Sequence, residues 1–168
     1  MRYYIIGYPG CGKTTFAKWL SEKTGRTFVD VDESIELLLN TSIPTIFKNE
    51  GEARFREIEA EVLRSIKDED TIVSCGGGLP CYKDNMSWML ENGLVIWLDV
   101  PLDIIKKRIV DDGLAKRPIM EKMAESGRLN EYIDIQYKER EPYYKKANII
   151  LNGKNFDFGW AKPESSRP

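Results

Sequence analysis

A glycine-rich loop near the start of the chain, Gly7-Tyr-Pro-Gly-Cys-Gly-Lys13-Thr14, constrains the fold more than any other feature. The apolar segment 2–6 before it predicts a short buried strand, and the apolar spacing in 14–23 after it predicts a helix. Glycines let the backbone curl so that its N–H groups converge on phosphate oxygens, and the helix adds its positive N-terminal end. The pattern Gly-x4-Gly-Lys-Thr between a strand and a helix therefore predicts a P-loop that binds a nucleoside triphosphate with magnesium.

Each position of this loop has an expected task. Lys13 is expected to reach the β- and γ-phosphates, and the hydroxyl of Thr14 is expected to ligate magnesium. A dinucleotide-binding turn would need a glycine at position 15 after Gly10 and Gly12, and Thr15 excludes it. The predicted nucleotide-binding residues of the loop are Gly10, Cys11, Gly12, Lys13, Thr14 and Thr15.

The rest of the chain alternates between predicted strands and helices. Strands are expected at 27–31, 71–74, 93–100 and 147–151, and helices at 33–40, 52–67, 101–108 and 128–140. This alternation predicts an α/β fold with a parallel sheet covered by helices on both faces. The polar stretch 111–126 lacks periodicity and is expected to be a mobile loop. Residues 1–151 are expected to form one domain, followed by an irregular tail over 152–168.

Composition excludes several classes of function. The 168 residues contain no histidine, which excludes histidine-based triads, histidine zinc sites and imidazole bases. A net charge of −2 offers no general cationic field for nucleic acid or a membrane surface, and no apolar run approaches the roughly 20 residues of a membrane span. Three cysteines in no metal-ligand spacing, without a signal peptide, indicate reduced thiols in a cytoplasmic protein. No long exposed apolar stripe is evident, so a monomer is expected.

Charged and glycine-rich segments elsewhere each admit two interpretations. Asp30 and Asp32 share a face of an extended strand end, where ligands bind in parallel sheets, but Asp32 also suits a helix N-cap. The charged segment 51–56 and the run around Arg140 could be solvated surface faces. Gly76-Gly77-Gly78 could be a plain turn, or a place where a ligand contacts the backbone.

Taken together, these segments resemble the shikimate kinase family of P-loop small-molecule kinases. The resemblance covers residues 4–151 in the family's order. Beyond the loop through Thr15, it is carried by Phe28-Val-Asp-Val-Asp32, Ile43-Pro-Thr-Ile-Phe47, Gly51-Glu-x-x-Phe-Arg56-x-x-Glu59, Gly76-Gly-Gly78, Lys116-Arg-Pro118 and Glu139-Arg-x-Pro-x-Tyr144. It implies a three-layer α/β/α P-loop kinase fold whose five-stranded parallel sheet has the order 2-3-1-4-5. It also implies a mobile lid at about 111–126 and an acceptor-binding helical region at about 32–62.

The resemblance further implies ATP-dependent phosphorylation of the 3-hydroxyl of shikimate, giving shikimate 3-phosphate and ADP in the route to aromatic amino acids. The implied catalytic residues are Lys13, Asp32 and Arg117. Among them, Asp32 orients or deprotonates the acceptor hydroxyl, and Arg117 neutralises the transferring phosphoryl group from the lid. Thr14 and Asp30 are implied to hold Mg2+, and Arg108 and Arg117 are implied to complete the ATP site. The implied acceptor-binding residues are Asp32, Arg56, Gly77, Gly78 and Arg140, with the two arginines clamping the shikimate carboxylate.

Two alternatives stay open. A related P-loop kinase acting on another small polyol or sugar acid, of the gluconate type, would keep Lys13 and Asp32 but need not keep Arg56 and Arg140. A nucleotide-binding module without an acceptor would bind ATP and show no turnover. The presence of both arginines favours an acceptor that bears a carboxylate.

Overall fold

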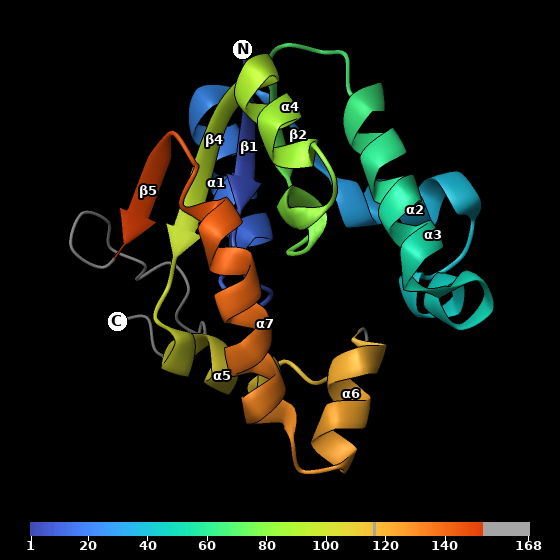
Figure 1. The fold of residues 1–168 in the computed structure, drawn as a ribbon. Helices are drawn as coiled ribbons and strands as arrows, with labels where there is room; N and C mark the ends of the chain where they lie inside the picture. Colours follow the sequence, from blue (N-terminus) through green and yellow to red (C-terminus); the bar gives the residue numbers. More distant parts are fainter. Residues whose placement is uncertain (116, 153–168) are drawn as a thin grey trace.

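Five parallel strands form one sheet in the order β2-β3-β1-β4-β5, which confirms the predicted order (Figure 1). The computed structural model describes residues 1–115 and 117–152. β1 lies at the centre, and Tyr4, Ile5 and Ile6 are fully buried, as expected for a strand covered on both faces. The strands are β1 Arg2–Ile6, β2 Thr27–Asp30, β3 Thr71–Ser74, β4 Gly93–Asp99 and β5 Ile149–Asn152.

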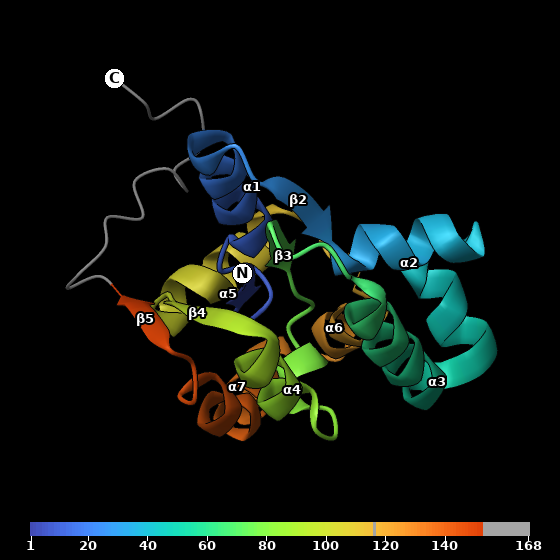
Figure 2. The same cartoon turned by 90° about the horizontal axis from the view of Figure 1, so that it is seen from above.

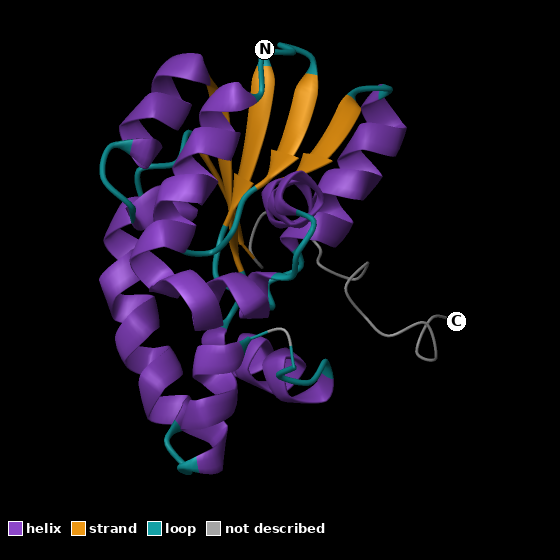
Figure 3. Cartoon of the chain, turned by 90° about the vertical axis from the view of Figure 1, so that its right-hand side faces the viewer, coloured by secondary structure: helices purple, strands orange, loops and turns teal. Residues whose placement is uncertain are grey.

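The strand register brings the carboxyl ends of all strands to one edge of the sheet. Tyr3 of β1 pairs with Ile72 of β3 on one side and with Leu94 of β4 on the other. Every pairing is parallel, so the strand arrows in Figure 3 point the same way. The segments that follow the strands therefore gather at this edge, where open parallel sheets bind their ligands.

Helices cover both faces of the sheet. Figure 2 shows α1 on one side and α4 and α7 on the other, which gives the predicted three layers. α6 and part of α7 extend beyond the carboxyl edge of the sheet (Figure 1). Within the described residues, no helix combines the length and apolarity needed to cross a membrane. The helices are α1 Lys13–Thr24, α2 Val31–Leu39, α3 Ile43–Ser65, α4 Asn85–Asn92, α5 Leu102–Asp111, α6 Pro118–Glu125 and α7 Leu129–Tyr144, with a 3-10 turn at Leu79–Cys81.

Helix α3 is longer than predicted and consists of two arms. Ser42 caps its start by accepting a hydrogen bond from the backbone N–H of Thr45. Gly51 interrupts it with φ 81° and ψ 172°, a conformation that glycine adopts without a side-chain clash. The predicted helix at 52–67 corresponds to the second arm. The prediction missed the first arm because 43–50 spans only about two turns, although Ile43, Ile46 and Phe47 have helical spacing.

Three further predicted boundaries are wrong. Val31 belongs to α2 rather than to a strand, because the side chain of Asp30 caps the helix there. The stretch 111–126 is not one continuous loop, because Pro118 begins α6 and Met120 is buried within it. The apolar pattern of α6 spans only about two turns, which is too short to be recognised as periodic. Asn152, expected to begin the tail, ends β5, and the rest of the predicted tail lies outside the described residues.

Asn85 is a fully buried polar residue that anchors the segment after the triple glycine. Its Nδ2 donates to the carbonyl oxygen of Leu79 at 2.9 Å. Its Oδ1 accepts from Nη1 of Arg64 at 2.7 Å. Both polar atoms of the amide are therefore satisfied inside the protein, and α3, α4 and the 3-10 turn are tied together at one residue.

We expect Asn85→Ala to lower the free energy of unfolding by about 1–3 kcal/mol, because it removes two hydrogen bonds that a buried side chain makes inside the protein. Urea denaturation measures the change. The matched control is Asn92→Ala on the same helix, where the amide bonds an exposed carbonyl and the loss should stay within about 0.5 kcal/mol. Equal losses in the two variants would contradict the anchoring role of Asn85.

Candidate active site

An open cleft with about 690 Å³ of empty space lies at the carboxyl edge of the sheet. It is lined by the phosphate loop, the start of α2, both arms of α3, the triple glycine, α6 and α7. Of the residues predicted for the acceptor side, the cleft brings together Asp32, Arg56, Gly77, Gly78 and Arg140. Arg117 lines it as well.

The predicted phosphate loop has the backbone of an anion-binding turn. Gly7, Gly10 and Gly12 all have positive φ, at 147°, 86° and 94°. The ammonium group of Lys13 donates to the carbonyl oxygens of Gly7 at 2.9 Å and Tyr8 at 3.1 Å. The ammonium also lies 3.8 Å from Sγ of Cys11. Lys13 is therefore held against the loop, and its charge has no carboxylate partner in the described part of the chain.

The other loop residues differ in exposure. Cys11 is fully buried and Thr15 is exposed at the first turn of α1. Gly10 lies against α5, since a Cβ there would be 3.0 Å from Cγ1 of Ile109. Arg108, also on α5, makes long contacts of 3.5 and 3.4 Å to the carbonyl oxygens of Gly10 and Cys11. α5 thus packs against the loop and brings Arg108 to it.

The two predicted metal ligands lie side by side. Oγ1 of Thr14 donates to Oδ2 of Asp30 at 3.0 Å and lies 3.3 Å from Oγ of Ser74. Asp30 and Ser74 end β2 and β3, and Thr14 lies in the first turn of α1, after the loop that follows β1. Hydroxyl and carboxylate oxygens are the ligands that Mg2+ prefers, so this group fits the predicted ion. Ser74 was not predicted, although its place at the end of a buried strand was a usable signal.

Asp30 also corrects the interpretation of its neighbour. Its Oδ1 accepts from the backbone N–H groups of Asp32 at 3.0 Å and Glu33 at 3.3 Å, so Asp30 is the N-cap of α2. Asp32 is therefore not the cap, and the two residues do not share a face of an extended strand. Asp32 still reaches the cleft, from the first turn of α2.

The carboxyl group of Asp32 lies in a buried and crowded place. Burial raises the pKa of Asp32 to about 6, and the negative charge of Asp30 adds to this rise against the opposing charges of Lys13 and Arg56. Its Oδ1 is buried and has no hydrogen-bond partner among the described residues. An unpaired acceptor beside the phosphate loop is well placed to accept a hydrogen bond from a bound hydroxyl.

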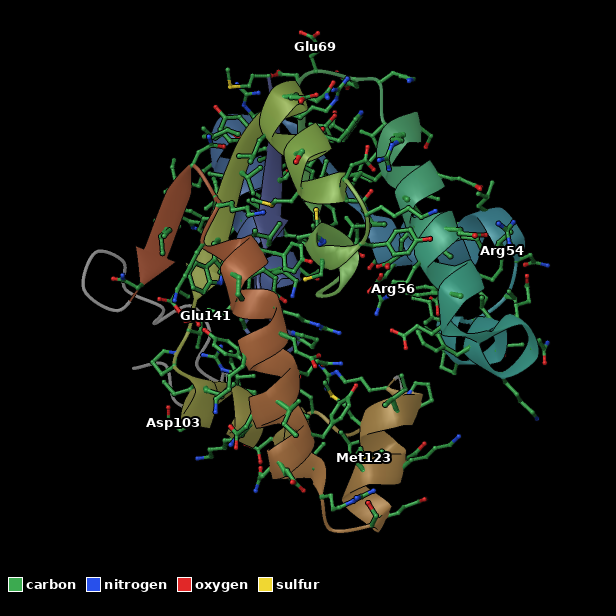
Figure 4. The ribbon with its side chains drawn as sticks, viewed as in Figure 1. Arg54, Arg56, Glu69, Asp103, Met123 and Glu141 are labelled. Carbon is green, nitrogen blue, oxygen red and sulfur yellow. The ribbon has the colours of Figure 1, made fainter. Side chains whose placement is uncertain are left out.

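Arg56 is held in the cleft by two glutamates. Its guanidinium donates to Oε2 of Glu59 at 2.5 Å and to Oε1 of Glu52 at 3.1 Å. Burial raises the pKa of Glu59 to about 7, because the charge of Arg56 only partly offsets the loss of water. Arg54, two residues earlier, points away from the cleft (Figure 4). The interpretation of 51–56 as a solvated face therefore holds for Arg54 and fails for Arg56.

The triple glycine runs between the two predicted clamp arginines. A Cβ on Gly78 would lie 2.6 Å from Cζ of Arg56, and a Cβ on Gly77 would lie 3.2 Å from Nη1 of Arg140. The hydroxyl of Tyr144 donates to the carbonyl oxygen of Gly77 at 2.6 Å and fixes the segment. Arg140 lies over the ring of Tyr8 at 5.5 Å and forms no ion pair within the described residues. It is therefore a cleft residue and not part of a surface ion-pair face.

Arg117 lies at the start of α6, on the rim of the same cleft. Its Nη1 donates to the carbonyl oxygen of Gly113 at 3.3 Å, and the bond is exposed. Within the part of the chain that the structure describes, this weak contact leaves most of the guanidinium donors unused. α6 follows directly, with Met120 lining the cleft, so Arg117 sits where the predicted lid meets the site.

The fold and the loop define a P-loop protein of the small-molecule kinase type. Residues 9–157 match the sequence profile of the shikimate kinase family. Shikimate kinase of Parabacteroides distasonis is 36% identical over 154 residues, 90% of this chain and 87% of that protein. Shikimate kinase of Persephonella marina is 37% identical over 150 residues, 89% of this chain and 87% of that protein.

Solved structures agree with this match. Shikimate kinase from Bacteroides thetaiotaomicron has a TM-score of 0.83 at 32% identity, covering 96% of this chain and 91% of that one. Shikimate kinase from Acinetobacter baumannii, solved in complex with shikimate, has a TM-score of 0.80 at 29% identity, covering 95% and 86%. The chain belongs to the shikimate kinase family.

We expect Asp32→Asn to raise the free energy of unfolding at pH 7.5 by about 1–3 kcal/mol. The folded-state pKa of about 6 exceeds the ordinary 3.8, so the protonated carboxyl stabilises the fold below about pH 4, and this stability is lost as the pH rises through about 6. Asparagine stays neutral and avoids the loss.

Urea denaturation at pH 4 and pH 7.5 measures this effect, and the gain should shrink at the lower pH. The control is Asp103→Asn, an exposed carboxylate in the first turn of α5, which should give no gain at either pH. An Asp32→Asn variant less stable than the parent at pH 7.5 would mean that the carboxylate is well paired in the fold.

Proposed function

We propose that this chain transfers the γ-phosphate of ATP to the 3-hydroxyl of shikimate, giving shikimate 3-phosphate and ADP for the synthesis of aromatic amino acids. One observation carries the choice of acceptor. Arg140, half-buried and without a carboxylate partner in the described residues, lies in the same cleft as Arg56 and Asp32. Two guanidinium groups suit a carboxylate, and an unpaired acceptor oxygen suits a hydroxyl. Family membership supports the same acceptor.

On the donor side, the loop N–H groups and Lys13 would bind the phosphates of ATP. Thr14 and Asp30 would hold Mg2+, with Ser74 as a neighbouring oxygen. When bound, Mg2+ neutralises negative charge on the phosphates. Because Lys13 bonds carbonyl oxygens of its own loop, it can exchange them for phosphate oxygens with little movement.

On the acceptor side, Arg56 and Arg140 would grip the carboxylate of shikimate, with the backbone of Gly77 and Gly78 against its ring. Asp32 would accept the proton of the attacking hydroxyl. A pKa of about 6 suits this task, because the group is ionised at neutral pH yet is a stronger base than an ordinary aspartate.

Arg108 and Arg117 would complete the nucleotide site, with Arg117 neutralising the transferring phosphoryl group as α6 closes over the cleft.

We also propose that residues 1–151 act as one kinase domain, with a lid at about 111–126 and an acceptor-binding region at about 32–62. A cytoplasmic monomer stays our prediction for its working form.

We expect the folded protein to release ADP from magnesium-ATP when shikimate is added, and to release less with quinate or gluconate. A coupled ADP-release assay measures this. Asp32→Asn should lower kcat by about 10²–10⁴-fold with little change in ATP binding, because it removes the base. No shikimate-dependent release from folded parent protein would overturn the proposed function.

We expect Arg140→Ala to raise the KM for shikimate about 10–100-fold and to leave the KM for ATP within about twofold. The variant loses charge-assisted hydrogen bonds to the carboxylate of shikimate and loses no contact with ATP. Arg54→Ala is the control, since Arg54 is exposed and pairs with Glu50, Glu57 and Glu61 outside the cleft. An equal rise in both KM values would remove Arg140 from the acceptor site.

A further inference from the structure

One face of α7 carries three polar residues that line the cleft. Tyr132, Gln136 and Arg140 are spaced by four, so they lie above one another on the same side of the helix. Arg140 is assigned to the acceptor carboxylate under the proposed function. The other two have no role there, although both are half-buried at the same wall.

A chain of hydrogen bonds joins this face to the phosphate loop. The hydroxyl of Tyr8 donates to Oε1 of Gln136 at 2.7 Å. Nε2 of Gln136 donates to the hydroxyl oxygen of Tyr132 at 2.5 Å. Tyr8 is itself fully buried, and its ring lies under Arg140. A buried residue of the donor loop therefore supports both Arg140 and Gln136.

The amide of Gln136 turns its oxygen toward Tyr8 and its nitrogen toward Tyr132. In this orientation the Tyr8 hydroxyl donates to the amide oxygen, because that oxygen can only accept. The amide nitrogen can only donate, so the Tyr132 oxygen accepts. The hydrogen of the Tyr132 hydroxyl is not used in either bond, and no acceptor for it occurs among the described residues. Burial raises the pKa of Tyr132, so the hydroxyl keeps this hydrogen at neutral pH.

Tyr132 lines the same cleft as both clamp arginines. The positive charges of Arg140 and Arg56 oppose the effect of burial on the pKa of Tyr132, and the negative charge of Glu52 adds to it. Of the three donor groups, Arg56 is already paired with Glu52 and Glu59, whereas Arg140 has no carboxylate partner among the described residues. A carboxylate has about four lone-pair positions, so it can accept from all three groups at once.

We propose that Tyr132 donates a further hydrogen bond to the acceptor carboxylate held by Arg56 and Arg140, with Gln136 and Tyr8 as its positioning residues. This inference rests on the proposed function, because it assigns another contact of the same acceptor. It gives the site one neutral, directional donor in addition to its two charges. Such a donor favours an acceptor with a carboxylate oxygen that points toward α7.

Tyr132→Phe tests the contact because it removes only the hydroxyl. The KM for shikimate should rise about 5–50-fold, while kcat and the KM for ATP stay within about twofold. The dissociation constant of shikimate, measured by calorimetry without nucleotide, should rise by a similar factor. Tyr143→Phe is the matched control on the same helix, since Tyr143 lies outside the cleft and its ring contacts Lys146. It should leave all three values unchanged.

A Tyr132→Phe variant with the shikimate affinity of the Tyr143→Phe control would overturn the inference and leave the proposed function intact. A KM for ATP that rises as much as the KM for shikimate would also overturn it. Failure of the proposed function looks different, because the parent protein would then show neither shikimate turnover nor shikimate binding.

The positioning role has its own readout. Gln136→Met keeps the length of the side chain and removes the amide that orients Tyr132. It should raise the KM for shikimate by less than Tyr132→Phe does, and it should add nothing in the double variant, because the two changes act through one hydroxyl. Effects that multiply in the double variant would remove Gln136 from this role. Urea denaturation of each variant checks that the fold is kept.

Discussion

The parallel pairing of β1 with β3 on one side and β4 on the other is the constraint on which the site depends. It makes the chain leave every strand at one edge, so residues far apart in sequence meet there. Thr14, Asp30 and Ser74 each follow or end a different strand, yet their oxygens lie in one hydrogen-bonded group. If any two of these strands were antiparallel, the oxygens that follow them would lie at opposite edges of the sheet, separated by the length of a strand.

That edge concentrates charge in a partly buried space. Asp30, Asp32 and Glu59 lie near Lys13 and Arg56, and the balance leaves one oxygen of Asp32 and one of Glu59 without partners in the described residues. Buried unpaired acceptors cost stability, and proteins keep such groups mainly where a ligand will satisfy them. The rest of the fold offsets this cost through the apolar packing of the central strands.

The sheet topology and most residues of the site could be predicted from the sequence. Helix boundaries, caps and individual hydrogen bonds were predicted less well. The sheet order and the convergence of Asp32, Arg56 and Arg140 were implied by the resemblance to the shikimate kinase family, whereas the parallel sheet itself followed from the alternation of strands and helices. The helix α6 could not be predicted, because its two turns give too short an apolar pattern. The cap at Asp30 was not predicted, because only Asp32 was considered as a possible cap, although either carboxylate fits the spacing. The bond from Tyr8 to Gln136 joins residues 128 positions apart, and only the fold shows that they meet.

The triple glycine at 76–78 limits how this protein can change over time. A Cβ at Gly76 would lie 2.4 Å from Oε1 of Glu59, and one at Gly77 would lie 2.6 Å from Cδ of Pro9. Every other amino acid brings a Cβ, so each substitution there begins with a collision against the cleft wall. A substitution at these positions therefore requires a matching shift of Glu59 or Pro9, so the glycines and the residues that face them can only change together.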